Sequence, residues 1–125
     1  IDSRQVMLNE IHIEMTRIDR AINALQPGLF GTEALKSISD SAFAIMPKAG
    51  MCDYPFAAKL AKLLREFCET PDVQNAAISP RALSVVKCLS DGLKTIIDHH
   101  IIGDGGAIGT TILDELAKLV ASDIS

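Results

Sequence analysis

The chain contains no tryptophan, one tyrosine and only four phenylalanines among its 125 residues. This scarcity of aromatic residues argues against a sheet-rich fold, and the abundance of Ala, Leu and Ile favours helices. Hydrophobic residues make up 48% of the chain and charged residues 22%, which is typical of globular proteins and excludes a disordered chain. A chain of this length is expected to form one domain, spanning residues 1–125.

The sequence also lacks a basic cluster and a long apolar run. Twelve Lys and Arg are scattered among sixteen Asp and Glu, giving a net charge of −4. Binding to nucleic acid needs a basic stripe, so we expect no nucleic-acid partner. No apolar run approaches the roughly 20 residues of a membrane span, and no charged-then-apolar leader precedes the first helix. We therefore expect a cytoplasmic protein that has no membrane partner.

The chain contains only three cysteines, and their spacing does not suggest a pair. Cys52, Cys68 and Cys88 are odd in number and form no CxxC motif. Neither a disulfide framework nor a zinc site is indicated. We expect all three to be small buried or half-buried hydrophobic residues, and we expect no metal and no cofactor.

What the sequence does contain is helical periodicity. Apolar residues recur at alternating spacings of three and four in five segments, which predicts five amphipathic helices. The expected core residues are Leu8, Ile11, Met15, Ile18, Ile22 and Leu25 in the first helix, Leu35, Ile38, Ala42, Ile45 and Ala49 in the second, Phe56, Leu60, Leu63 and Phe67 in the third, Leu83, Val86, Leu89, Leu93 and Ile96 in the fourth, and Leu113, Leu116 and Val120 in the fifth.

Caps and breakers predict where these helices begin and end. Gln26-Pro27-Gly28 ends the first, and Thr32 caps the second, whose end is marked by Pro47 and Gly50. The third begins near Asp53, with Pro55 in its first turn, and ends at Thr70-Pro71-Asp72.

A polar connector then leads through Asn75 to Ser79-Pro80, which caps the fourth helix. Gly103-Asp-Gly-Gly106 breaks the chain before the fifth helix, which starts at Thr110 or Thr111. The narrow apolar stripes and short loops predict an all-α fold, an antiparallel four-helix bundle with one additional helix.

No stretch of the sequence carries a specific catalytic motif. The glycine-rich segment at 103–109 has neither the spacing of a dinucleotide-binding loop nor a following Gly-Lys-Ser/Thr, so we interpret it as a loop that ends a helix. His99 and His100 are adjacent on a helix and point about 100° apart, which is a poor geometry for two metal ligands. The serines lack a nucleophile elbow. We therefore assign no catalytic residue, and lean towards a protein that is not an enzyme.

The second helix offers the best candidate for a functional surface. Asp40 lies about 200° from the core positions Ile38 and Ala42, and is therefore expected to be exposed. Lys36, four residues before it, Phe43, three after it, and Ala44, four after it, share its face. An exposed aromatic ring beside a carboxylate and a lysine is typical of surfaces that dock a protein partner.

The order of these elements resembles the histidine-containing phosphotransfer (HPt) domain family, a four-helix bundle preceded by a short helix. In that family the acceptor helix carries His-x-x-Lys and a Gly ten residues after the His, and an apolar-striped helix follows. When Gly50 is placed on that Gly, Asp40 takes the place of the histidine and Phe43 that of the lysine. The segment Leu89-Ser-Asp91-Gly-Leu93-Lys-Thr-Ile-Ile97 and the later Leu113-Asp-Glu-Leu116 resemble the closing helix pair.

The resemblance implies a non-catalytic module of a bacterial two-component phosphorelay. Without an imidazole at the acceptor position no phosphoramidate can form there. An aspartate that carries phosphate needs acidic neighbours to bind a metal, and none shares its face. Asp40 is then a fixed charge, and Lys36, Asp40, Phe43 and Ala44 would dock a receiver domain or a histidine kinase.

Two alternatives remain open from the sequence. The chain could be an active phosphotransfer protein that uses His12, which flanks the apolar stripe of the first helix and is interpreted as a boundary residue at the edge of the core. It could also be a generic helical oligomerisation domain in which Phe43 and the first helix make a self-contact.

Overall fold

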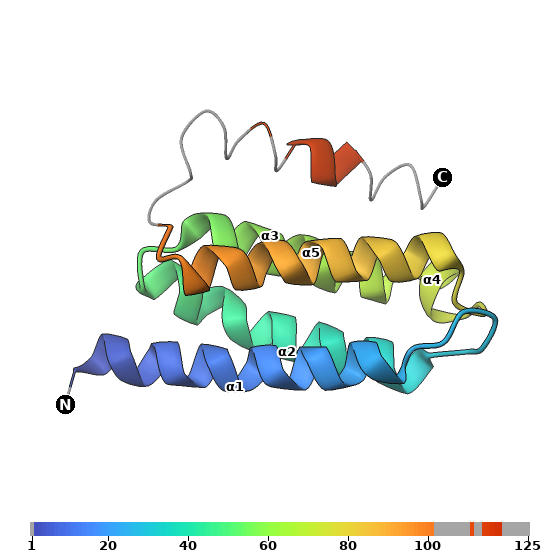
Figure 1. Cartoon of the computed structure of the whole chain (residues 1–125), viewed down its shortest axis with the longest axis horizontal. Coiled ribbons are helices and arrows are strands. Elements are labelled where there is room, and N and C mark those ends of the chain that lie inside the picture. The colour runs from blue at the N-terminus through green and yellow to red at the C-terminus, as the bar shows by residue number, and fades with distance from the viewer. Residues whose placement is uncertain (1, 102–110, 112–113, 119–125) are drawn as a thin grey trace.

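The computed structural model describes residues 2–101, 111 and 114–118, and it is mostly helical (Figure 1). The helices are α1 (Ser3–Ala24), α2 (Thr32–Met51), α3 (Pro55–Glu69), α4 (Pro71–Gln74) and α5 (Pro80–Asp98). Residues 111 and 114–118 are also helical. The described part contains no strand, only one isolated bridge between Phe30 and Ala77. The prediction of an all-α fold is therefore confirmed.

Four long helices lie side by side around one core (Figure 1). α2 packs against α1 and α3, and α5 packs against α3 and α1. Each long helix supplies side chains that are 0% exposed, such as Ile11, Ile38, Leu64 and Leu89. In the described residues, no helix is long and apolar enough to cross a membrane.

The core of α1 and α2 follows the predicted stripes closely. All the core positions predicted for these two helices are buried except Leu8, which is half-buried. α1 ends at Ala24, and the break at Gln26-Pro27-Gly28 is confirmed, with a positive φ of 87° at Gly28. The apolar spacing predicts the buried positions correctly because residues three and four apart lie on one side of a straight helix.

The predicted N-cap of α2 is wrong. Gly31 is the capping residue, and Thr32 is already the first helical residue. The hydroxyl of Thr32 donates instead to the carbonyl of Gln74 in α4, at 3.1 Å. A tertiary contact therefore uses the side chain that local capping rules assign to its own helix.

The end of α2 also differs from the prediction, because the helix continues through Pro47 and Gly50 to Met51. Proline lacks an N–H group, but the buried residues on either side of it, Ile45 and Ala49, hold the helix against the core. The turn is then closed by Asp53, which adopts a left-handed φ of 66°.

The apolar faces of α3 and α5 are displaced by one position at single sites. Leu63 and Leu83 are only half-buried, whereas their neighbours Leu64 and Ala82 are buried. A helix face that alternates spacings of three and four allows either neighbour to face inward, and the sequence pattern did not decide between them. The Ser79 cap of α5 is confirmed, because its hydroxyl accepts from the N–H of Ala82 at 2.9 Å.

The segment between α3 and α5, predicted as a polar connector, contains the one-turn helix α4, whose Val73 is buried. Cys52 and Cys68 are buried as expected, but Cys88 is exposed, so that prediction is wrong for one of the three thiols.

The predicted loop at 103–109 and the fifth-helix core residues Leu113 and Val120 lie outside the described residues.

Candidate functional site

Asp40 is exposed on the outer surface of α2, between two grooves. The groove between α1 and α2 has a volume of about 750 Å³ and includes Asp40, Ala44 and the α1 residues Glu14 and Arg17. The second groove brings Lys36 and Asp40 together with Glu69, at the end of α3. Asp40 can therefore accept hydrogen bonds from a partner lying in either groove.

The four predicted site residues do not share one environment. Lys36 and Asp40 are exposed, Phe43 is 57% exposed, and Ala44 is half-buried. Ala44 faces the groove with α1, whereas Phe43 faces a groove with α3. Asp40 thus lies between Ala44, on the α1 side, and Phe43, on the α3 side. The predicted docking face of α2 is therefore wider than a single row of side chains.

Phe43 is held by a contact that the sequence analysis missed. The guanidinium carbon of Arg65, on α3, lies 4.1 Å from the centroid of its ring, within the range of a cation–π contact. One face of the ring is therefore covered by the protein itself. A partner would contact the other face and the edge.

Arg65 belongs to a chain of polar contacts that ties α3 to α2 beneath Asp40. It pairs with Glu69 at 3.2 Å, and the same carboxylate oxygen of Glu69 accepts from the hydroxyl of buried Ser39 at 2.9 Å. The spacing of Arg65 and Glu69, four apart on a helix, could have been found in the sequence. The partner Ser39 could not, because it depends on how α2 and α3 are rotated.

Glu14 is a second residue whose role was missed. Its side chain lies among the buried residues of α1, only 8% exposed as a residue, and pairs with Arg17 three positions later. Removing a carboxylate from water is costly unless a partner compensates its charge. Glu14 and Arg17 therefore place opposite charges on the α1 side of the Asp40 groove.

His12 is exposed on α1, so its interpretation as a residue at the edge of the core is wrong. It is not among the residues that form the groove around Asp40. Its ring is accessible to solvent, as an acceptor would need, but it belongs to a different surface from Lys36, Asp40 and Phe43.

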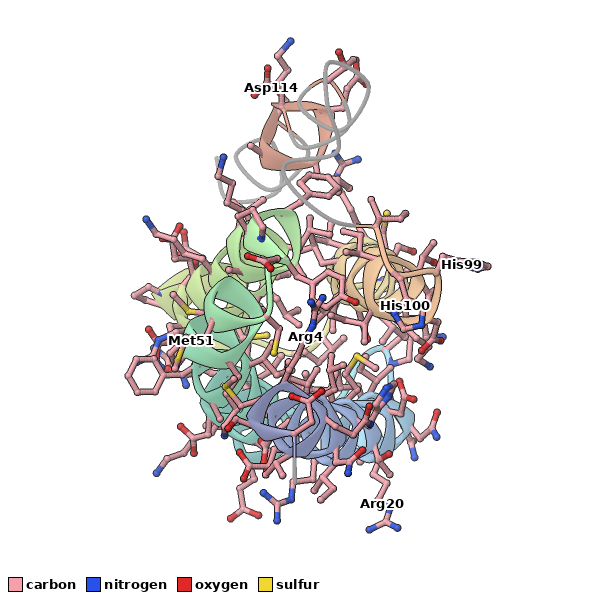
Figure 2. All side chains as sticks on the ribbon, turned by 90° about the vertical axis from the view of Figure 1, so that its left-hand side faces the viewer. Arg4, Arg20, Met51, His99, His100 and Asp114 are labelled. Atoms are coloured by element: carbon pink, nitrogen blue, oxygen red, sulfur yellow. The ribbon has the colours of Figure 1, made fainter. Side chains whose placement is uncertain are left out.

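The two adjacent histidines lie at the far end of α5, away from Asp40. The Nδ1 atom of His100 lies 3.0 Å from the hydroxyl of buried Tyr54, whereas His99 points outward (Figure 2). Arg4 lies over the ring of Tyr54, at 5.7 Å from its centroid. Among the described residues, no group of three or more His, Cys, Asp or Glu could hold a metal ion. The contacts of Tyr54 with His100 and Arg4 join the α2–α3 turn to the end of α5 and to the start of α1.

Comparisons of the chain with protein-family models, curated proteins and solved structures give no significant match.

Proposed function

We propose that the chain is a non-catalytic, HPt-like signalling module, a four-helix bundle with one additional helix, that docks a two-component partner through the exposed face of α2. The partner would be a receiver domain or a histidine kinase. The observation that carries the proposal is Asp40 itself, ten residues before Gly50 on an acceptor-like helix, exposed and bordered by grooves on both sides.

The chemistry of this face supports docking and not phosphoryl transfer. A carboxylate at the acceptor position supplies a negative charge and two acceptor oxygens, but no imidazole nucleophile. Phe43 adds an apolar surface, and its contact with Arg65 restricts its ring before a partner arrives. A side chain that is already ordered loses less conformational entropy on binding. The module would then act as an adaptor or a competitor in a phosphorelay.

Substitution of Asp40 or Phe43 by alanine is expected to weaken binding of a receiver domain about tenfold each, because central interface residues typically contribute more than 1 kcal/mol. The measurement is calorimetric titration of the full chain with a panel of purified receiver domains and kinase domains. Matched controls are Asp91→Ala and Phe30→Ala, exposed residues of the same types on α5 and in the α1–α2 loop. If no domain binds, or if all four variants bind equally, the proposal is wrong.

His12 provides the test of the alternative function, because it is exposed on α1. A non-catalytic module is expected to take up no acid-labile phosphate when it is incubated with a phosphoryl donor. The wild type and His12→Ala should therefore give the same background. Acid-labile label on the wild type that disappears in His12→Ala would contradict our proposal and establish active phosphotransfer.

A further inference from the structure

A third groove, between α2 and α3, differs from the two that border Asp40. It is formed by Phe43, Met46 and Pro47 of α2 and by Ala58, Lys59 and Lys62 of α3, with a volume of about 510 Å³. Apart from the two ammonium groups, the side chains that form it are apolar. Asp40 is not among the residues that form it.

The two lysines are poorly neutralised by the protein itself. Lys59 is exposed and has no ion pair with any residue in the described part of the chain. Lys62 meets Glu66 at 4.0 Å, with both side chains more than half exposed, and such pairs contribute little. An apolar groove in a chain of net charge −4 is thus flanked by two available positive charges.

The shape of the site selects the type of ligand. A groove between two packed helices accommodates a rod, and an amphipathic helix places its apolar face into such a groove. The charge of the two lysines then requires acidic residues beside the apolar face of the bound helix.

The same two lysines also border a second hollow, which includes residues of the later helical segment. Asp114 and Ala117 border a hollow together with Lys59, Lys62 and Leu63 on the other side of α3. Figure 2 shows Asp114 beyond α3, on the side away from α1. The groove with α2 is on the opposite side of the same lysines, and none of the described residues of that segment is among those that form it.

We propose that the α2–α3 groove binds an acidic amphipathic helix of the docked partner, with apolar side chains against Phe43 and Met46 and carboxylates towards Lys59 and Lys62. This inference rests on the proposed docking function, and it names the element that the partner contributes. Because Asp40 borders only the other two grooves, binding of the helix is independent of its charge.

The test uses the full chain and a stapled helical peptide of about 15 residues, with leucines at helical spacing flanked by glutamates. Fluorescence anisotropy should detect binding at low salt. Lys59→Glu is expected to raise the Kd about fivefold, since it replaces an attraction by a repulsion. Lys87→Glu, the same change on the exposed surface of α5, should alter the Kd less than about twofold.

A second peptide, with lysines in place of the glutamates, should bind the wild type more weakly and gain affinity for Lys59→Glu. Equal binding of both peptides, absence of binding to the acidic one, or equal effects of the Lys59 and Lys87 substitutions would overturn the inference. Binding to phosphatidylserine vesicles that depends on Lys59, without peptide binding, would assign the groove to a membrane and also overturn it.

Asp40→Ala separates this inference from the proposed function. We expect it to leave peptide binding unchanged, although it weakens receiver-domain binding. Receiver binding that depends on Asp40 without peptide binding would reject the helix groove alone. Peptide binding without any receiver or kinase binding would reject the proposed function and retain the groove.

Discussion

Tyr54→Ala is expected to lower the free energy of unfolding by about 3–5 kcal/mol, the range for truncation of a buried aromatic side chain. Tyr54 is 0% exposed and connects α2 to α3. Its removal would leave a cavity and also remove the ring beneath Arg4 and the hydroxyl that contacts His100. Urea unfolding followed by circular dichroism measures the loss.

Tyr54→Phe separates the ring from its hydroxyl. It keeps the buried ring and removes only the contact with Nδ1 of His100, so we expect a loss of about 1 kcal/mol. His100 is exposed and can replace this contact with water. In a His100→Ala background the effect of Tyr54→Phe should become smaller, because the partner is already absent. A Phe variant as unstable as the Ala variant would show that the hydroxyl, and not ring burial, dominates.

The sequence predicts those parts of this fold that depend on one helix at a time. The stripe of Ile11, Met15 and Ile18 identifies the buried side of α1 because its spacing alone determines the face. Asp40 was expected to be exposed by the same geometry, and it is. Such predictions need no knowledge of the neighbouring helices.

The errors occur where a second helix decides the result. Pro47 was expected, together with Gly50, to mark the end of α2, but the helix continues to Met51, because burial of Ile45 and Ala49 against the core outweighs the lost hydrogen bond. Thr32 has the chemistry of a cap, but its hydroxyl contacts α4. Local propensity is a weak guide when tertiary contacts are available to the same residue.

The candidate site likewise has one part that the sequence predicts and another that it does not. Its central charge, Asp40, follows from helical geometry, but its supporting contacts do not. The ring of Phe43 is covered by Arg65, and Arg65 is oriented by Glu69, from a helix whose rotation the sequence does not specify. Helical periodicity therefore gave the exposed position, while the width of the face and its grooves required the structure.

Cys68 gives the second large effect, a loss of stability at alkaline pH. Burial raises the pKa of Cys68 from 9.0 to about 12, and the neighbouring Glu69 carboxylate contributes in the same direction. In the folded protein the thiol keeps its proton, whereas in the unfolded chain it ionises near its ordinary pKa. The native state then binds more protons between these values, so raising the pH favours unfolding.

The contribution of Cys68 to stability is complete below pH 9.0, its unfolded pKa, and decreases as the pH rises towards 12. At 1.36 kcal/mol per pH unit, the loss should reach about 2 kcal/mol at pH 10.5 and about 4 kcal/mol near pH 12. Urea unfolding of wild type and Cys68→Ala between pH 8 and about 10.5 measures it. Other residues that titrate in this range are common to both proteins and cancel in the difference.

The free energies of unfolding of the wild type and Cys68→Ala should converge as the pH rises. The variant loses a constant amount of stability because its side chain is smaller, but it has no thiol to ionise. Cys88→Ala, which removes an exposed thiol, is the control for the loss of a cysteine outside the core. Parallel curves for Cys68→Ala would contradict the raised pKa.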